Sequence, residues 1–395
     1  MSAKVCVNAL ECGGLPVNCR IYRGQLLPSL TPKRLGGGVP EGVIYACHAE
    51  GAGRFFVCTE SGVYVSGSGT NFVELIPHSG STPFLIESIK DGKPLAVVIS
   101  GGKCVIHTGQ SFMGHTTGLN LSCGIMRCGR LFGVDGEDRL KIIWTDGEGF
   151  GLGGSVTLDP ELGSVTGIAE LGEKLVFIRK FGLSTANMFG SPENFSIDTV
   201  GFGTDETVQG TAAVVGGKLI FSTVSGLCSF DGSAVERIDC RCSQDMERPH
   251  SAVAFNGKYY IACYSKLLKR NAVACYDPTD GESFLVDTEA DALCAADGVY
   301  AFNSLGTYRL EEGGEYSFTT EEINFGGGGY KTVTRAFFDC DGADFEISNG
   351  RVTRKYSGVC GALRPRLRGK SFTVIVRGKV PVKKLNLTAE ACDEI

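Results

Sequence analysis

The sequence is poor in tryptophan, proline and long apolar runs, and each shortage excludes a class of protein. It has one tryptophan and 13 prolines among 395 residues. Nowhere does it hold the run of about 18 apolar residues that a membrane-spanning helix needs. Its first residues offer only a short stretch, VCVNAL after Lys4, where a signal peptide needs about 7 to 15 apolar residues. The sequence therefore predicts neither export nor a membrane span.

Motifs of catalytic and metal sites are also missing. The sequence has no CxxC, HExxH, GxSxG or GxxxxGK[ST], and no Asp-box repeat of the sialidase type. The five histidines are far apart, and the closest cysteine pairs, Cys240 with Cys242 and Cys123 with Cys128, lack zinc spacing. We therefore expect no catalytic residue, no metal and no cofactor. Paired carboxylates from separate repeats would escape this search, so a glycosidase-like site stays open.

Cysteine, in contrast, is abundant. The 17 cysteines are odd in number, and several stand inside apolar runs such as FFVC (Cys58) and AVAC (Cys275). Thiols in such positions are typical of small core residues in a reducing compartment. This pattern predicts free cysteines in a protein made in the cytoplasm.

Glycine, with 56 residues, marks an internal repeat. The repeated unit is an apolar strand, a glycine turn, a very apolar strand, a small polar turn and a strand rich in Tyr, Val or Phe, as in RFFVCTESGVYVS (54–66). The turn glycines before the very apolar strands, spaced by 39, 37, 43, 45, 40 and 41 residues, are Gly53, Gly92, Gly129, Gly172, Gly217, Gly257 and Gly298.

This repeat predicts an all-β fold, a β-propeller over residues 41–323. Its central strands, such as LIFST and YYIAC, are apolar on both faces because each blade packs between two neighbours. Seven blades are expected, and six if the unit around Gly129 or Gly257 is an insertion. The signatures of WD40 and kelch repeats are absent, and the single Trp144 cannot mark seven blades.

The two ends differ from the repeat. Residues 324–395 alternate apolar and polar positions, as in SFTVIVRG, which predicts a C-terminal antiparallel β-sandwich. The glycine run at 326–329 is the expected hinge. Residues 1–40 hold short strands that either close the ring or form an arm against the sandwich.

Charge is divided unevenly along the chain. Residues 324–395 carry 13 basic and 7 acidic residues, a net charge of +6, so a total of -6 leaves -12 for the first 323 residues. The predicted partner-binding residues are Arg351, Arg354, Lys355, Arg364, Arg366, Arg368, Lys370 and Arg377. Their partner would be an acidic protein surface, such as a neighbouring subunit's propeller, or DNA; the alternative is a solvated strand face. No aromatic residue interleaves RPRLRGK, which argues against single-stranded nucleic acid.

The order of elements resembles propeller-bearing tail stabilisation or tail-hub proteins of short-tailed bacteriophages and prophages. The resemblance rests on the N-terminal strands, the propeller units, GSPENFS (190–196), FSTVSGLCSFDG and the closing LRPRLRGKSFTVIVRGKVPVKKLNLTAE. It implies a non-enzymatic virion subunit, made in the host cytoplasm and assembled into the tail. Such a subunit would form a homo-oligomeric ring that contacts tail or portal proteins.

A second hypothesis is a propeller that binds or cleaves carbohydrate at the host surface. Such a site requires a cluster of exposed aromatic and acidic side chains at one mouth of the ring, whereas a joint requires apolar or charged surface patches.

Overall fold

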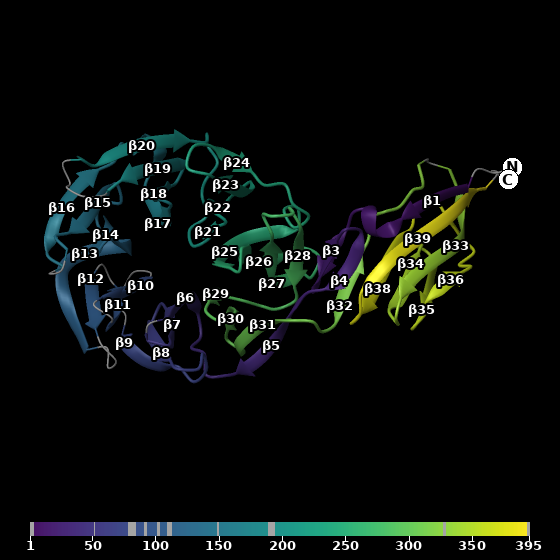
Figure 1. Cartoon of the computed structure of the whole chain (residues 1–395), viewed down its shortest axis with the longest axis horizontal. Coiled ribbons are helices and arrows are strands. Elements are labelled where there is room, and N and C mark those ends of the chain that lie inside the picture. The colour runs from purple at the N-terminus through teal and green to yellow at the C-terminus, as the bar shows by residue number, and fades with distance from the viewer. Residues whose placement is uncertain are drawn as a thin grey trace.

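The protein is built of β-strands in the part that the structure describes. The computed structural model describes residues 4–50, 52–77, 84–90, 93–100, 103–108, 113–147, 150–188, 194–326 and 329–392. Within these ranges the only helical segments are two short 3-10 turns, η1 (Ala9–Glu11) and η2 (Pro160–Leu162), and no helix is long and apolar enough to cross a bilayer. Figure 1 shows a ring of sheets beside a smaller body that carries both ends of the chain.

Four separate sheets of the ring have four antiparallel strands each. Hairpins connect neighbouring strands, and the first strand of each sheet lies nearest the centre (Figure 1). The sheets are β6 (Val43–Ala49), β7 (Arg54–Thr59), β8 (Gly62–Ser66), β9 (Val73–Pro77); β17 (Val165–Leu171), β18 (Lys174–Arg179), β19 (Gly182–Asn187), β20 (Ser196–Gly201); β21 (Ala213–Val215), β22 (Lys218–Thr223), β23 (Gly226–Phe230), β24 (Val235–Arg237); and β29 (Ala292–Ala295), β30 (Val299–Asn303), β31 (Gly306–Glu312), β5 (Leu30–Gly36). They confirm the all-β class and the β-propeller arrangement.

A seven-stranded sheet continues the ring through one long strand. The first part of β13 pairs with β12 and its last part pairs with β14, so each end of β13 belongs to a different set of hairpins. The strands are β10 (Phe84–Lys90), β11 (Lys93–Ser100), β12 (Lys103–Thr108), β13 (Met113–Arg127), β14 (Arg130–Asp135), β15 (Lys141–Thr145) and β16 (Leu152–Thr157).

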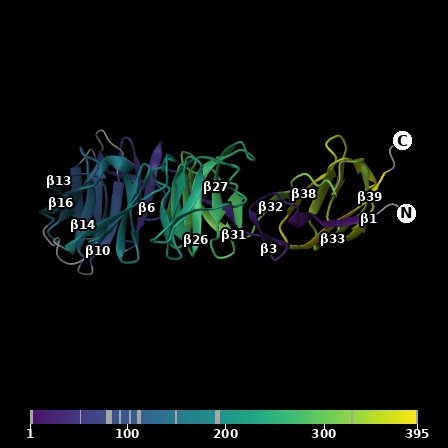
Figure 2. The same cartoon turned by 90° about the horizontal axis from the view of Figure 1, so that it is seen from above.

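A nine-stranded sheet joins the ring to the C-terminal body. Strand β2 pairs in parallel with β28 of the ring and antiparallel with β32 of the body, so backbone hydrogen bonding is continuous between them. Figure 2 shows the two parts side by side in a view along the plane of the ring. In order, the strands are β25 (Met246–Phe255), β26 (Lys258–Ser265), β27 (Arg270–Tyr276), β28 (Ser283–Val286), β2 (Leu15–Val17), β32 (Tyr316–Thr319), β38 (Thr373–Gly378), β34 (Asp344–Ser348) and β35 (Thr353–Tyr356).

A second sheet completes the C-terminal body. It shares one apolar core with the β32–β35 end of the nine-stranded sheet, and Phe338 stacks on Phe345 across that core with ring centroids 3.8 Å apart. The strands are β3 (Cys19–Tyr22), β4 (Gln25–Pro28), β39 (Val382–Ala391), β33 (Lys331–Cys340) and β36 (Gly361–Leu363), with β1 (Lys4–Asn8) beside β39 and β37 (Leu367–Gly369) beside β33.

The N-terminal segment fills both roles that the sequence left open. Strand β5 completes the sheet of β29–β31, whereas β1, β3 and β4 lie in the C-terminal body. The body also includes β32, which begins at Tyr316, ahead of the expected boundary at residue 324. Because β32 enters the body before the glycine run, the connection lies outside the expected hinge; residues 327 and 328 are outside the described ranges.

The glycine anchors and the apolar strands behave as the repeat predicts. The anchor glycines, apart from Gly92 in an undescribed stretch, lie in turns that lead into the second strand of each hairpin set. Gly129 and Gly217, for example, have φ of 74° and 78°, a conformation that glycine adopts without a Cβ clash. The strands that follow are buried on both faces, as in Leu219–Thr223 of β22.

All 17 cysteines are free. Ten are buried, including Cys58 and Cys275, and burial raises the pKa of each of these two thiols to about 12. Such thiols stay protonated near neutral pH and pack as small apolar side chains.

Asn18 ties the ring to the C-terminal body with all four of its polar groups. Its N–H donates to Leu285 O (2.7 Å), its carbonyl accepts from Ser29 N (2.9 Å), its Oδ1 accepts from Asp287 N (2.8 Å), and its Nδ2 donates to Glu315 O (3.2 Å). Its φ of 57° lies in the left-handed region, which asparagine tolerates better than alanine does.

We therefore expect Asn18→Ala to lower the free energy of unfolding by about 2–3 kcal/mol, because it adds backbone strain to the loss of two hydrogen bonds. Asn18→Gly, the matched control, keeps the backbone relaxed and should cost about 1 kcal/mol less. Urea denaturation of both variants measures the difference. Equal losses would show that the conformation of residue 18 contributes nothing.

Candidate functional site

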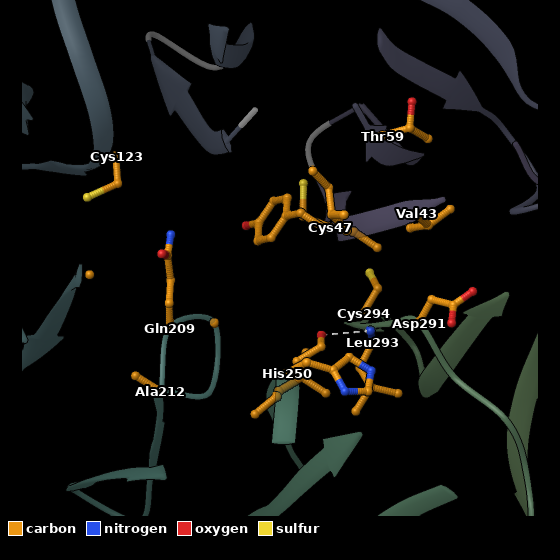
Figure 3. Close-up of a pocket in the computed structure, with 18 of the residues that line it drawn as sticks. Val43, Cys47, Thr59, Cys123, Gln209, Ala212, His250, Asp291, Leu293 and Cys294 are labelled. Atoms are coloured by element: carbon orange, nitrogen blue, oxygen red, sulfur yellow. Dashed lines mark hydrogen bonds between the residues drawn. The ribbon is translucent and has the colours of Figure 1, made fainter. Parts of the chain in front are cut away.

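The ring encloses a central cavity of about 1370 Å3. Its walls come from the innermost strands β6, β17, β25 and β29, from Cys123 of β13, and from the loops that lead into these strands. In Figure 3, Gln209 and Cys123 lie on one side of the view and His250, Asp291 and Cys294 on the other. The lining mixes hydroxyl, amide, thiol and aliphatic groups, with carboxylates at Glu41, Glu60 and Asp291.

His250 is held by backbone on both sides of its ring. Its Nδ1 lies 3.2 Å from Arg248 O and its Nε2 lies 3.0 Å from Ala290 O, so the imidazole links β25 to the loop before β29. The adjacent Ser251 accepts a hydrogen bond from Leu293 N (3.0 Å) through its hydroxyl (Figure 3). Burial raises the pKa of Asp291, and the nearby His250 partly offsets that effect. These groups brace neighbouring sheets against each other.

The cavity offers little for covalent or metal chemistry. Burial raises the pKa of Cys123 to about 12, so this thiol is a poor nucleophile near neutral pH. No group of three His, Cys, Asp or Glu residues that could hold a metal ion occurs among the residues described. Tyr45 is the one phenol or indole ring in the lining, and Trp144 is 6% exposed. The cluster of exposed aromatic and acidic side chains that a carbohydrate site requires is therefore not found in this lining.

Three exposed apolar side chains stand on the face where the cavity opens. We define the mouth face by the turns between second and third strands together with the loops into the innermost strands. Val224, Leu267 and Leu305 occupy such turns in three adjacent sheets, and they are 76%, 46% and 60% exposed. Apolar residues grouped on one face are typical of a protein-binding surface.

The turns that carry these apolar side chains are braced by a repeated polar contact. Asp205 accepts from Thr223 Oγ1 (2.6 Å) and Ser225 N (3.2 Å). Asp245 does the same with Ser265 Oγ (2.6 Å) and Leu267 N (2.7 Å). The turn residues are therefore displayed on a fixed backbone and not on mobile loops.

Sequence reasoning missed the repeated position behind this bracing. The last residue of the second strand is polar yet buried in five sheets, at Thr59, Arg179, Thr223, Ser265 and Asn303. The signal that could have found it is a polar residue closing each very apolar strand, at nearly the same spacing as the glycine anchors.

The eight basic residues predicted to bind a partner all lie in the C-terminal body, but in two separate groups. Arg351, Arg354, Lys355 and Arg377 belong to the β34–β35 turn, β35 and β38, and Glu346 pairs with Lys355 (3.3 Å) and Arg377 (2.6 Å). Arg364, Arg366, Arg368 and Lys370 lie on residues 364–370, along the free side of β33 in the other sheet.

Comparisons with known proteins identify the fold of the ring. No protein-family model and no curated protein matches the chain. Among solved structures, Raptor of Chaetomium thermophilum matches 71% of this chain with a TM-score of 0.54 and 10% identity. The WD40 repeats of RRP9 match 72% with a TM-score of 0.53 and 12% identity, and U3-55K matches 71% with a TM-score of 0.51 and 12% identity.

The matched lengths differ between these structures. The match covers 29% of the Raptor chain, 100% of the RRP9 repeats and 98% of U3-55K. Identities this low show the propeller fold alone. The WD40 signature is missing from this sequence although the fold is shared, because blade packing needs apolar strands and turns but not that particular motif.

Proposed function

We propose that this protein is a non-enzymatic structural subunit that holds other proteins together. The observation that carries the proposal is the mouth face, where Val224, Leu267 and Leu305 are exposed on braced turns of adjacent sheets. Propellers of the WD40 type, which the ring resembles, typically act as protein-interaction scaffolds. The lining of the cavity, with its protonated thiol and backbone-bound histidine, supports a scaffold better than an enzyme.

The sheet order supports seven blades and a C-terminal sandwich as parts of this proposal. Four blades are separate sheets, β13 divides the seven-stranded sheet into two more, and β25–β28 supply the seventh. Gly129 and Gly257 precede β14 and β26, which are regular members of these blades and not insertions. The two sheets around the Phe338 and Phe345 core form the sandwich.

The narrower proposal is a tail or head-tail joint subunit of a bacteriophage or prophage. It rests on the resemblance in the order of elements; residues 190–193 of GSPENFS lie outside the described ranges, and Phe195 packs edge-on against Trp144 with centroids 5.2 Å apart. Copies would form a ring in which a basic sandwich meets an acidic propeller. A strict monomer by mass measurement, together with no co-sedimentation with tail or portal particles, would contradict it.

Replacing the three mouth-face residues by serine tests the scaffold proposal. We expect Val224→Ser/Leu267→Ser/Leu305→Ser to weaken co-sedimentation with tail particles more than 10-fold while the melting temperature stays within about 2 °C, because exposed side chains contribute little to stability. The matched control replaces Val73, Leu152 and Val352, which are 66%, 66% and 44% exposed away from the mouth face. Equal weakening by both triple variants would contradict a specific surface.

A further inference from the structure

A row of four cations follows one edge of the C-terminal body. Over residues 364–370 exposure alternates strictly, with Pro365, Leu367 and Gly369 buried between exposed basic side chains. Strands β36 and β37, at either end of this segment, both pair with β33 and close the sheet on that side (Figure 1). We call the exposed side chains the cationic strip: Arg364, Arg366, Arg368 and Lys370.

The strip lacks the carboxylate partners that other cations of the body have. Glu346 pairs with Lys355 and Arg377, whereas no Asp or Glu oxygen of the described chain lies within 4.0 Å of a strip nitrogen. Residues 351–384 contain no acidic residue at all. Four neighbouring cations without internal counter-charges favour an anionic ligand with several charges.

An aromatic ring lies beside the strip. Tyr330, just before β33, is 39% exposed; the Arg368 guanidinium carbon lies 5.2 Å from its ring centroid and Lys370 Nζ lies 5.4 Å from it. The sequence-based argument against single-stranded nucleic acid, that no aromatic interleaves RPRLRGK, is therefore incomplete. The aromatic comes from the adjacent strand and not from the basic segment.

The strip also holds a strained backbone position. Leu363 pairs with Ala336 and Leu367 with Val333, so three residues of the segment face two of β33 and form a bulge. Within it Arg366 has φ of 50°, where glycine is the unstrained residue. Strain of this kind is typical of functional positions, and here it keeps a cation in the row.

We propose that the cationic strip and Tyr330 bind extended single-stranded nucleic acid, with phosphates along the strip and an unpaired base on the tyrosine ring. Alternate residues of an extended segment repeat every ~6.7 Å, comparable to successive phosphates of an extended strand. Tyr330 favours this ligand over a duplex, whose bases are stacked, and over an acidic protein, which would need only the charges. The proposal concerns the C-terminal body and stands apart from the mouth face.

Fluorescence anisotropy with labelled dT20 between about 50 and 200 mM salt tests the proposal. We expect the full chain to bind, and replacement of all four strip residues by glutamine to lower the slope of log K against log salt by about 3, since each phosphate contact contributes about 0.7. The matched control replaces the other four predicted basic residues, Arg351, Arg354, Lys355 and Arg377, by glutamine. It removes the same charge and should keep the slope.

Two milder variants separate binding from folding. Tyr330→Leu should weaken binding about 10-fold and Tyr330→Phe should keep it, because stacking needs the ring and not the hydroxyl. Arg366→Gly should weaken binding without lowering the melting temperature, because glycine relaxes the bulge.

Four results would overturn the proposal. They are no binding of dT20 at low salt, equal loss in both quadruple variants, equal affinity for a dT20·dA20 duplex, and displacement of dT20 by poly-glutamate at matched charge. If the strip variant instead binds dT20 normally but self-associates in size-exclusion chromatography, the cations serve only to protect a sheet edge, and the proposal is wrong.

Discussion

Arg179→Ala is expected to lower the free energy of unfolding by about 3–5 kcal/mol, because it empties a large buried volume and strands polar groups. Arg179 is 0% exposed, and burial lowers its pKa. Its guanidinium donates to Gly163 O (2.7 Å), to Asp159 O and to Ser184 Oγ (3.3 Å). One side chain thereby fixes the loop around η2 onto the end of β18. Urea denaturation measures the loss.

Two variants give that result its meaning. Arg179→Lys should recover about half of the loss, since an ammonium group cannot reach all three acceptors at once. Thr223→Val, at the equivalent position of the neighbouring blade, should cost only about 1 kcal/mol, because a single hydroxyl is removed. If Arg179→Ala behaved like Thr223→Val, the buried guanidinium would not be the clamp described above.

Removing residues 1–36 is expected to open the ring. This truncation deletes β5, which pairs with β31 from Leu30 with Glu312 to Gly36 with Thr307. Without it, the sheet of β29–β31 loses its outer strand and the ring loses the only covalent link from its last sheet back to its first. We expect amide hydrogens of β30 and β31 to exchange about 100-fold faster.

A truncation of residues 1–28 is the matched control. It deletes β1–β4, and so disturbs the C-terminal body equally, but it keeps β5. Protection of β30 and β31 should therefore survive in this variant. Similar exchange in both truncations would show that β5 is dispensable for closing the ring.

The sequence predicts the local repeat well and the long-range pairing poorly. Glycine turns and apolar strands are encoded within about 15 residues, so the anchors lie where the repeat places them. The partners of β2, β5 and β32 are hundreds of residues away or in another body, and a three-residue strand such as Leu15–Val17 carries no pattern that names them.

The candidate surfaces follow the same division. Eight basic residues predicted as one face belong to two sheets, because Arg354 and Arg368, only 14 residues apart, are separated by a crossing of the core. Tyr330 reaches Arg368 through pairing between strands. The apolar mouth face is assembled from turns about 40 residues apart, each unremarkable by itself.

The pairing of the N-terminal strand sets a timetable for folding during synthesis. Lys4 of β1 pairs with Glu390 of β39, so the strand made first among those described needs the strand made last. At roughly 5–20 residues per second, the wait is on the order of 20–80 s. Throughout it β1, β3 and β5 are unpaired strands on a growing chain, and each is a target for wrong pairing or for a chaperone. The ring and the body thus become complete together, when translation ends.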